Sequence, residues 1–336
     1  MKRAPLAIVL LLFFSNAAIA ATDYRIVSIA PPGVMGQAWD VNNGGTVVGC
    51  LNINNEWRAY RWTNGALTDL GAGCATAINA AGLIGGHTPA GDLVLWNGST
   101  TTPLGINGDI TGINTQGLVV GSYKDSAGAT HGFTWYAGQL TTLPDVPGST
   151  TTLANGVNAP GQVVYTGAGR GFVYRNGQST EIPGINGSGS ATPNAINNDG
   201  VVVGMGSDRG PAAFVYANGQ TTRVPGSPGY SSAVAINNVG QILGSAEGSY
   251  GYLCDGGACV NLSSFPGVQA ATWRHLEPST LNDNGWIVGS GANLQGDNTP
   301  FVMIPATAGN NGNGNGPSNA NAGGTNGKGK RRVAAN

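Results

Sequence analysis

The chain has few charged residues and few residues suited to catalysis. Asp, Glu, Lys and Arg make up 9% of its 336 residues, against about 25% in an average globular domain. The three histidines, His87, His131 and His275, are far apart in the sequence, which argues against a shared metal ion. No Gly-x-Ser-x-Gly or Walker loop occurs. We therefore assign no catalytic, cofactor-binding or metal-binding residue.

Long apolar runs are also scarce. The one clear run, residues 6–14, follows Lys2 and Arg3 and precedes the small-residue triplet Ala18-Ile19-Ala20. This is the pattern of a secretory signal, so we predict that residues 1–20 are a signal peptide cleaved after Ala20. The run is too short to span a membrane. We expect a secreted or periplasmic protein without a transmembrane segment.

The basic residues are unevenly distributed. Of the fifteen Lys and Arg, two lie in the signal and four lie in the segment 306–336, which leaves nine against sixteen acidic residues in the body. The body therefore carries a net negative charge, which argues against nucleic-acid binding because that function needs a basic surface. Residues 306–336 are rich in Gly and Asn and cannot bury a core, so we expect a disordered tail. We expect the basic residues at its end to be solvated, and the alternative is that they contact an anionic surface.

Glycine is abundant, with 57 residues, and much of it belongs to a repeat. Residues 195–204 read AINNDGVVVG: a branched aliphatic residue, an Asn, a Gly three positions later and a β-branched residue two positions after that. Branched residues favour strands, and Asn and Gly favour tight turns. Each copy therefore predicts a strand, a turn and a strand. The repeated asparagines are Asn42, Asn79, Asn114, Asn158, Asn197, Asn237 and Asn282.

A second hairpin follows each copy. Its first strand carries two bulky residues one apart, such as Phe214 and Tyr216, and an Asn-Gly turn follows in several copies. Two hairpins make four strands, and successive repeat asparagines are 35 to 45 residues apart. Four strands in such a length are typical of a propeller blade. The sequence therefore predicts an all-β, seven-bladed β-propeller over residues 21–305, as one domain.

The two ends of this domain are complementary. The last copy ends after its third strand, residues 301–304, and an unpaired strand, residues 24–29 (YRIVSI), precedes the first copy. We predict that the N-terminal strand completes the last blade and so closes the ring, which would hide an open sheet edge.

Four cysteines in an exported chain suggest two disulfides. Cys254 and Cys259 flank the turn of one hairpin, which predicts a cross-strand bridge. Cys50 ends a strand of the first blade and Cys74 begins the next blade, so a second bridge is predicted there. A metal site is the alternative, but the spacing matches no zinc pattern.

The two kinds of turn, Asn-x-x-Gly and Asn-Gly, must lie on one rim of the disc, called here the turn rim. We expect longer loops on the opposite rim, called the long-loop face, within residues 50–59, 122–131, 205–211 and 290–300 and in the crossings 144–151 and 265–277. Binding residues are usually carried on loops of a rigid scaffold. The alternative is that these aromatic residues cover the blade ends and the charges are solvated. The candidate binding residues are Trp57, His87, Tyr123, Lys124, Asp125, His131, Arg170, Asp208, Arg209, Glu247, Tyr250, Trp273, Arg274 and His275.

The repeat resembles the bacterial extracellular repeat named after its His-Ala-Phe triplet, the HAF repeat. The similarity covers residues 38 to about 304, although only His131 keeps the histidine of the triplet and Gly132 replaces its alanine. The resemblance implies export and a propeller-like repeat, and it supplies no catalytic residues. The matching segments are Arg58-Ala59-Tyr60-Arg61-Trp62, His131-Gly132-Phe133-Thr134-Trp135 and Ala212-Ala213-Phe214-Val215-Tyr216.

These observations favour a monomeric, non-catalytic, exported module that binds a glycan or a protein on its long-loop face. A first alternative is a carbohydrate-active enzyme with acidic residues such as Asp208 and Glu247 at the channel mouth. A second is a structural component of the envelope or matrix, with the tail as a tether.

Overall fold

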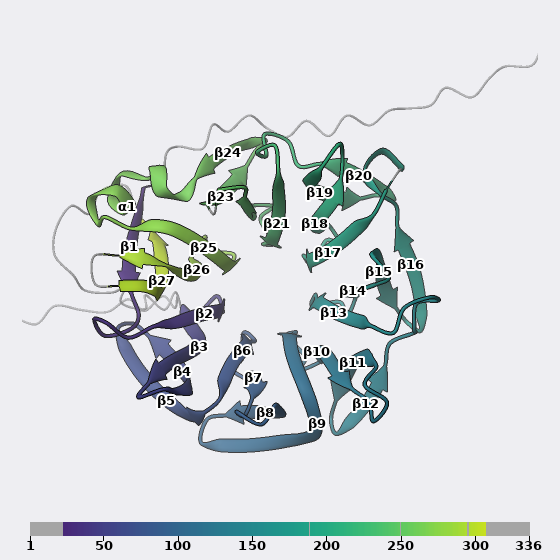
Figure 1. Ribbon diagram of the computed structural model, residues 1–336, viewed down its shortest axis with the longest axis horizontal. Coiled ribbons are helices and arrows are strands. Elements are labelled where there is room, and N and C mark those ends of the chain that lie inside the picture. Colours follow the sequence, from purple (N-terminus) through teal and green to yellow (C-terminus); the bar gives the residue numbers. More distant parts are fainter. Residues whose placement is uncertain (1–22, 188, 249, 294–295, 307–336) are drawn as a thin grey trace, which may run out of the picture.

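The computed structural model describes residues 23–187, 189–248, 250–293 and 296–306. The predicted signal peptide and the predicted tail beyond residue 306 lie outside these residues. The described part of the chain is built almost entirely from strands, with one short α-helix, α1 (Pro266–Ala270), and two 3₁₀ turns, η1 (Ile185–Gly187) and η2 (Leu262–Ser264). Figure 1 shows the strands arranged in sheets that form a ring around a central axis.

Within the described residues, five sheets have four antiparallel strands and a sixth has seven. The four strands that belong to one repeat are called a unit, and the seven-stranded sheet contains two units that share a strand. The first unit contains β2 (Gly36–Val41), β3 (Thr46–Ile53), β4 (Glu56–Thr63) and β5 (Ala66–Ala72). Three later units contain β13 (Thr152–Val157), β14 (Val163–Gly167), β15 (Arg170–Arg175) and β16 (Gln178–Ile182); β17 (Ala191–Ile196), β18 (Val202–Ser207), β19 (Pro211–Ala217) and β20 (Gln220–Arg223); and β21 (Ser231–Ile236), β22 (Ile242–Ala246), β23 (Tyr250–Asp255) and β24 (Ala258–Asn261).

The seven-stranded sheet arises because one long strand serves two units. The first half of β9 pairs with β8, from Thr100 opposite Asn97, and its second half pairs with β10, to Ile113 opposite Val119. No loop is therefore needed between these two units. The strands are β6 (Cys74–Ile78), β7 (Ile84–His87), β8 (Asp92–Asn97), β9 (Thr100–Ile113), β10 (Val119–Lys124), β11 (Thr130–Tyr136) and β12 (Gln139–Thr142).

The two ends of the described chain share one sheet. Strand β1 (Tyr24–Ser28) pairs antiparallel with β27 (Gly296–Pro305), with Tyr24 opposite Pro305 and Ser28 opposite Phe301. The sheet continues through β26 (Ile287–Asn293) to β25 (Arg274–Leu281). The N-terminal strand thus pairs with the last repeat, as its sequence position suggested.

The repeat residues form the turns for which their chemistry suits them. In the turn after β17, Gly200 has a φ of +79°, and the Oδ1 atom of Asn197 accepts hydrogen bonds from the backbone N–H groups of Asp199 and Val201 at 3.1 and 3.0 Å. In the turn after β15, Asn176 and Gly177 both have positive φ, at +51° and +82°, as a two-residue hairpin requires. The sequence therefore specifies these turns locally.

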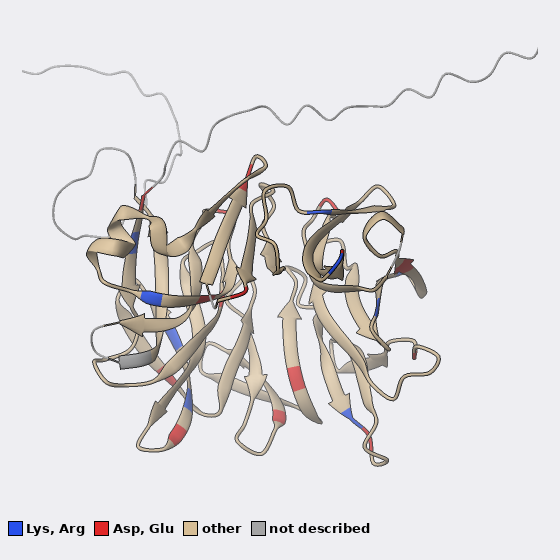
Figure 2. Cartoon of the chain, turned by 45° about the horizontal axis from the view of Figure 1, so that its top comes forward, with Lys and Arg blue, Asp and Glu red and all other residues tan. Residues whose placement is uncertain are grey.

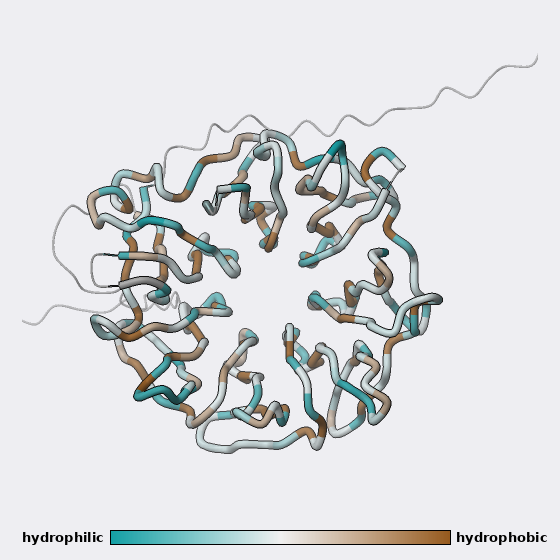
Figure 3. Tube along the Cα trace, in the orientation of Figure 1, coloured by the Kyte–Doolittle hydropathy of each residue, from teal (hydrophilic) through white to brown (hydrophobic). Residues whose placement is uncertain are grey.

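The apolar core is divided among the interfaces between neighbouring sheets. One cluster combines Val203 and Ala213 of one unit with Ala233 and Tyr252 of the next, all fully buried. Figure 3 shows hydrophobic segments within the sheets and hydrophilic ones at several tips around the central axis. Burial on both faces holds each sheet against its neighbours.

The hairpins on the long-loop face are shorter than the sequence suggested. Strand β3 continues to Ile53 and β4 begins at Glu56, so only Asn54 and Asn55 form the connection. Both have positive φ, which allows pairing to continue to the end of the hairpin. Strands likewise occupy much of the expected loops at 122–131, 205–211 and 290–300. The crossings are longer, and the one after β24 contains α1.

Candidate functional site

The seven repeat asparagines link the units by a chain of hydrogen bonds. The Nδ2 group of each one donates to the backbone carbonyl oxygen of the repeat asparagine in the next unit. Six of the seven side chains are buried, so each bond also satisfies a donor that water cannot reach. The links run from Asn42 to Asn79 (3.1 Å), Asn79 to Asn114 (3.1 Å), Asn114 to Asn158 (3.2 Å), Asn158 to Asn197 (2.9 Å), Asn197 to Asn237 (3.3 Å), Asn237 to Asn282 (3.0 Å) and Asn282 to Asn42 (2.9 Å).

Asp283 is held in a second set of polar contacts on the turn rim. Its carboxylate accepts from Asn43 Nδ2 at 2.8 Å, from the backbone N–H of Asn238 at 2.8 Å and from Asn238 Nδ2 at 3.0 Å. Burial opposes ionisation, but these donors outweigh it and lower the pKa of Asp283. Its oxygens are thus engaged by the protein itself, and the Asp283 turn follows the same pattern as the other repeats.

On the long-loop face, an exposed tyrosine lies at the junction of the β17–β20 and β21–β24 units. Tyr230 is 53% exposed, and its ring lies against Gly210, where a Cβ atom would overlap it. The backbone N–H of Glu247 donates to the Tyr230 carbonyl at 3.0 Å, and that of Asp208 donates to the Gly210 carbonyl at 2.9 Å. These residues, together with Arg223, are called the Tyr230 cluster.

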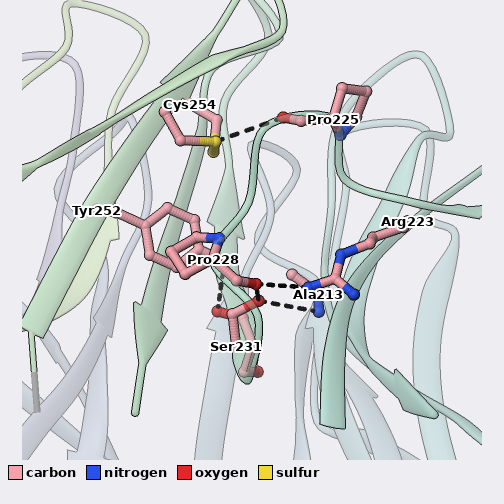
Figure 4. The surroundings of a disulfide bond; sticks show 9 residues. Ala213, Arg223, Pro225, Pro228, Ser231, Tyr252 and Cys254 are labelled. Carbon is pink, nitrogen blue, oxygen red and sulfur yellow. Dashed lines mark hydrogen bonds between the residues drawn. A yellow bond between two sulfur atoms is a disulfide. The ribbon is translucent and has the colours of Figure 1, made fainter. Parts of the chain in front are cut away.

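Arg223 fixes the chain segment that carries Tyr230. Its Nη2 donates to the Pro228 carbonyl at 2.6 Å, and its Nη1 lies 3.8 Å from Asp208 Oδ2. Ser231 Oγ also donates to the Pro228 carbonyl, at 2.9 Å, and accepts from the backbone N–H of Ala213 at 3.4 Å. Figure 4 shows Arg223 and Ser231 converging on Pro228. The tyrosine is therefore presented by a fixed segment.

Both predicted cysteine pairs lie at disulfide distance. Cys50 of β3 and Cys74 of β6 join two neighbouring units, with an S–S distance of 2.00 Å. Cys254 and Cys259 are directly opposite each other in β23 and β24, with an S–S distance of 1.94 Å. Cys259 Sγ is 3.4 Å from the Pro225 carbonyl oxygen, at the start of the crossing that leads to Tyr230. Disulfides are consistent with an extracellular or periplasmic location.

His131 lies between two carboxylates. Its Nε2 is 3.0 Å from Asp125 Oδ2 and its Nδ1 is 3.1 Å from Asp145 Oδ1. The hydrogen bonds to Asp125 and then to Asp145 raise the pKa of His131. The ring centroid of Tyr123 is 5.5 Å from that of His131. This arrangement ties the β10–β11 hairpin to the crossing after β12.

The other candidate residues are on separate units. Trp57 on β4 is 44% exposed, Tyr250 begins β23 and is half-buried, and His275 on β25 is exposed. Arg170 pairs with Glu181, through Nε and Oε1 at 2.7 Å, and its guanidinium carbon is 5.3 Å from the Phe172 ring centroid. Lys124, Arg209 and Arg274 are exposed, and His87 Nδ1 is 3.0 Å from the Thr88 carbonyl.

Trp273 does not belong to the surface. It is 7% exposed and packs edge-on against Phe301, with ring centroids 5.6 Å apart. The residue follows α1, which turns the chain back toward the β25–β27 sheet, so the indole enters the core between the two. It therefore offers little surface to a ligand.

The structure brings Asp208 and Glu247 to the same place, on either side of the Tyr230 segment, and leaves Trp57, His131, Arg170 and His275 on other units. Sequence reasoning missed Tyr230 and Arg223. Tyr230 lies in Pro228-Gly229-Tyr230, a crossing next to the first strand of a unit. An aromatic residue directly after a Pro-Gly pair in a crossing was the sequence feature that could have indicated this position.

A polar groove of about 420 Å³ lies on the turn rim, between the β13–β16 and β17–β20 units. We expected any binding site to lie on the long-loop face, and this groove lies on the opposite rim. The groove is lined by Gln162, Val173, Arg175, Asn176, Gln178, Thr180, Gly200 and Tyr216.

Other kinds of site find no support in the described part of the chain. No group of three His, Cys, Asp or Glu side chains among these residues is placed to hold a metal ion. None of their helices is both long and apolar enough to cross a membrane. Figure 2 shows basic residues as isolated segments interspersed with acidic ones, unlike the continuous basic surface of a nucleic-acid-binding protein.

Comparisons with known proteins identify the fold. No protein-family model matches the chain, and no curated protein matches it. The β-propeller domain of the Trilobed protease from Pyrococcus furiosus, described as having an open velcro topology, is 10% identical with a TM-score of 0.54, over 82% of this chain and 94% of that one. The β-propeller domain of Cps50 (Swd1) from Myceliophteria thermophila is 10% identical with a TM-score of 0.55, over 84% and 100%. YCF48, solved bound to the D1 peptide, is 10% identical with a TM-score of 0.51, over 87% and 98%.

At such low identity these similarities show the fold alone. Together with the antiparallel four-stranded units, they place the chain in the class of β-propeller proteins.

Proposed function

We propose that the chain is an exported, seven-bladed β-propeller that binds a glycan or a protein on its long-loop face without catalysing a reaction. A count of seven blades is supported by dividing the seven-stranded sheet at β9 into two units. Closure of the ring is supported by the pairing of β1 with β27 and by the hydrogen bond from Asn282 to Asn42. We expect the protein to be a monomer.

The Tyr230 cluster is the observation that carries this proposal. A tyrosine that is 53% exposed lies on a segment fixed by Arg223, and the hairpins that contact it carry Asp208 and Glu247. Tyrosine contributes a large apolar face and a polar hydroxyl at a small entropic cost, which suits both glycan and protein ligands. A fixed position also lowers the cost of binding.

Export is supported by the two disulfides and by the N-terminal sequence pattern. The similarity to the HAF repeat agrees with export and with a propeller, and membership of that repeat family remains a prediction.

The test compares two exposed tyrosines. Tyr230→Ala removes the ring on the long-loop face, and Tyr136→Ala removes the ring of a residue that is 55% exposed at a hairpin turn on the turn rim. Both purified variants and the wild-type protein are applied to a glycan array and used for a pull-down from an envelope extract. We expect the Tyr230 variant to lose about tenfold or more in affinity for the ligand found and the Tyr136 variant to bind normally. Blank results with folded wild-type protein, or equal binding by all three, would overturn the proposal.

The enzymatic alternative uses the same cluster. Asp208 and Glu247 flank Tyr230, but the Asp208 carboxylate faces the Arg223 guanidinium, which favours a role in holding the segment. Asp208→Asn separates the two alternatives. A glycosidase would lose release of reducing sugar from a polysaccharide that the wild-type protein degrades, whereas a binding module releases none.

A further inference from the structure

We propose that the groove between the β13–β16 and β17–β20 units binds an acidic saccharide, with Arg175 recognising a carboxylate of the ligand. This site lies on the turn rim, opposite the Tyr230 cluster. It depends on the contacts of this one groove and is independent of the function proposed for the long-loop face.

One side chain of the repeat gives the groove part of its polar lining. In some units the residue after the repeat glycine lies near a glycine of a neighbouring unit: Trp286 lies against Gly45, and Leu118 lies near Gly161. At the equivalent position beside Gly200 the residue is Gln162, which is smaller than Trp and polar. Its Oε1 accepts from Asn158 Nδ2 at 2.9 Å, which directs the amide into the groove lining. The apolar side chain found at this position in those two units is thus replaced by an amide that can form hydrogen bonds.

A second unit shows what is unusual about Arg175. In the β21–β24 unit, the corresponding Gln241 donates from Nε2 to Asp255 Oδ2 at 3.1 Å. Arg175 occupies the position in the β13–β16 unit that Asp255 occupies in the β21–β24 unit. Asp255 directly follows Cys254, which pairs with Ile242, and Arg175 directly follows Tyr174, which pairs with Val163. The residue at the position opposite Gln162 is therefore a donor instead of an acceptor, and both residues line the groove. A ligand that supplies acceptors would satisfy both groups.

Arg175 has no partner among the described residues. Arg58, Arg170 and Arg223 each have a carboxylate within 4 Å, whereas Arg175 is exposed and forms neither an ion pair nor a hydrogen bond there. A guanidinium binds a carboxylate by two parallel hydrogen bonds and is the side chain best suited to this ligand. A single arginine matches one carboxylate, while a phosphate-rich ligand would require more positive charge.

The rest of the lining points to a hydroxylated ligand. Asn176, Gln178 and Thr180 provide amide and hydroxyl groups along one side, and the half-buried ring of Tyr216 lies on the other unit. These groups donate and accept hydrogen bonds, as sugar hydroxyls do. The volume of about 420 Å³ is in the range of roughly 300–1,000 Å³ typical of small-ligand sites. A short saccharide with a uronic acid residue combines both features.

Asp199 provides an internal check. It is exposed in the turn directly before Gly200 and does not line the groove itself. Its negative charge near the groove should weaken the binding of an acidic ligand and should hardly affect a neutral one.

The experiment is titration calorimetry of the full chain with trigalacturonic acid, and with the neutral galactose trisaccharide for comparison. We expect the acidic trisaccharide to bind and the neutral one to bind about tenfold or more weakly. Arg175→Gln should weaken binding of the acidic trisaccharide about tenfold or more, and Asp199→Asn should tighten it about twofold to fivefold. Lys124→Gln, which removes a positive charge on the other rim, should leave it unchanged. Circular dichroism confirms that each variant is folded.

Several outcomes would overturn the proposal. They are no binding by folded wild-type protein up to about 10 mM ligand, equal binding of both trisaccharides, or equal binding by the Arg175 variant. Competition by inorganic phosphate or by an acidic peptide as strong as that by the trisaccharide would show that the ligand class is wrong. The Tyr230→Ala variant should bind trigalacturonic acid normally, so failure of either proposal can be distinguished from failure of the other.

Discussion

Asn282 donates a hydrogen bond from Nδ2 to the carbonyl oxygen of Asn42 at 2.9 Å, although 240 residues separate them. The Oδ1 atom of the same side chain accepts from the backbone N–H groups of Asn284 and Trp286 within its own turn. One amide therefore closes a local turn and joins two distant units. A repeat residue that does both makes the turn geometry and the packing of the units depend on each other.

We predict that Asn197→Ala destabilises the protein by about 1–3 kcal/mol, because it removes the acceptor of the Asp199 and Val201 N–H groups and the inter-unit donor to the Asn237 carbonyl oxygen. The free energy of unfolding is measured by urea denaturation. Asn197→Asp is the comparison variant: it keeps an oxygen for the N–H groups of Asp199 and Val201, loses the donor to Asn237, and adds a buried carboxylate whose charge should lower stability further at neutral pH. An alanine variant as stable as the wild-type protein would show that the inter-unit bonds contribute little.

The two disulfides should differ in their contributions to stability. A chain-entropy model gives about 3.5 kcal/mol for Cys50–Cys74 and about 2 kcal/mol for Cys254–Cys259, because they enclose segments of 24 and 5 residues. Replacing each pair by serines and measuring urea denaturation without reductant checks the order. The opposite order would mean that the contact of Cys259 with the Pro225 segment outweighs loop entropy.

Asp40 should make stability depend on pH. Burial raises the pKa of Asp40 from 3.8 to about 6, against the opposing effect of hydrogen bonds from the backbone N–H groups of Ile78 and Val41. The folded protein then holds this proton more tightly than the unfolded chain. The resulting stabilisation is present below about pH 4 and is lost as the pH rises to about 6.

Asp40→Asn removes the ionisation and keeps an oxygen that can accept from Ile78. We expect the variant to be more stable than the wild-type protein above pH 6, by up to about 3 kcal/mol, and the difference to vanish near pH 4. Unfolding free energies measured from pH 4 to pH 7 check this. A difference that stays constant with pH would contradict it.

His131 should titrate above its ordinary value because Asp125 and then Asp145 raise its pKa. The stabilisation from the charged imidazole is complete below about pH 6.5 and is lost as the pH rises through the raised pKa. NMR titration of the His131 ring should show a lower pKa in Asp125→Asn and in Asp145→Asn. Lys124→Gln removes a nearby positive charge and should not lower it. An unchanged pKa in both aspartate variants would mean that the two contacts do not persist in solution.

The hairpins and the Cys254–Cys259 disulfide followed from local chemistry. Gly200 needs a positive φ and Asn197 has acceptors for its Oδ1 within four residues, so the turn is specified by a few neighbouring positions. Cys254 and Cys259 are opposite each other because the hairpin between them is short. The extent of the hairpins did not follow, since Asn54 and Asn55 were read as part of a long loop and form a two-residue connection.

The sequence by itself determined the strands, their turns and the repeated four-stranded unit, because each depends on interactions among residues close together in the chain. Only the tertiary structure decided that Tyr230 stands beside Asp208 and Glu247, that Trp273 is buried against Phe301, and that Arg175 borders a groove opposite Tyr216. Those contacts join different units, and their geometry depends on how neighbouring sheets pack, which a single repeat does not encode.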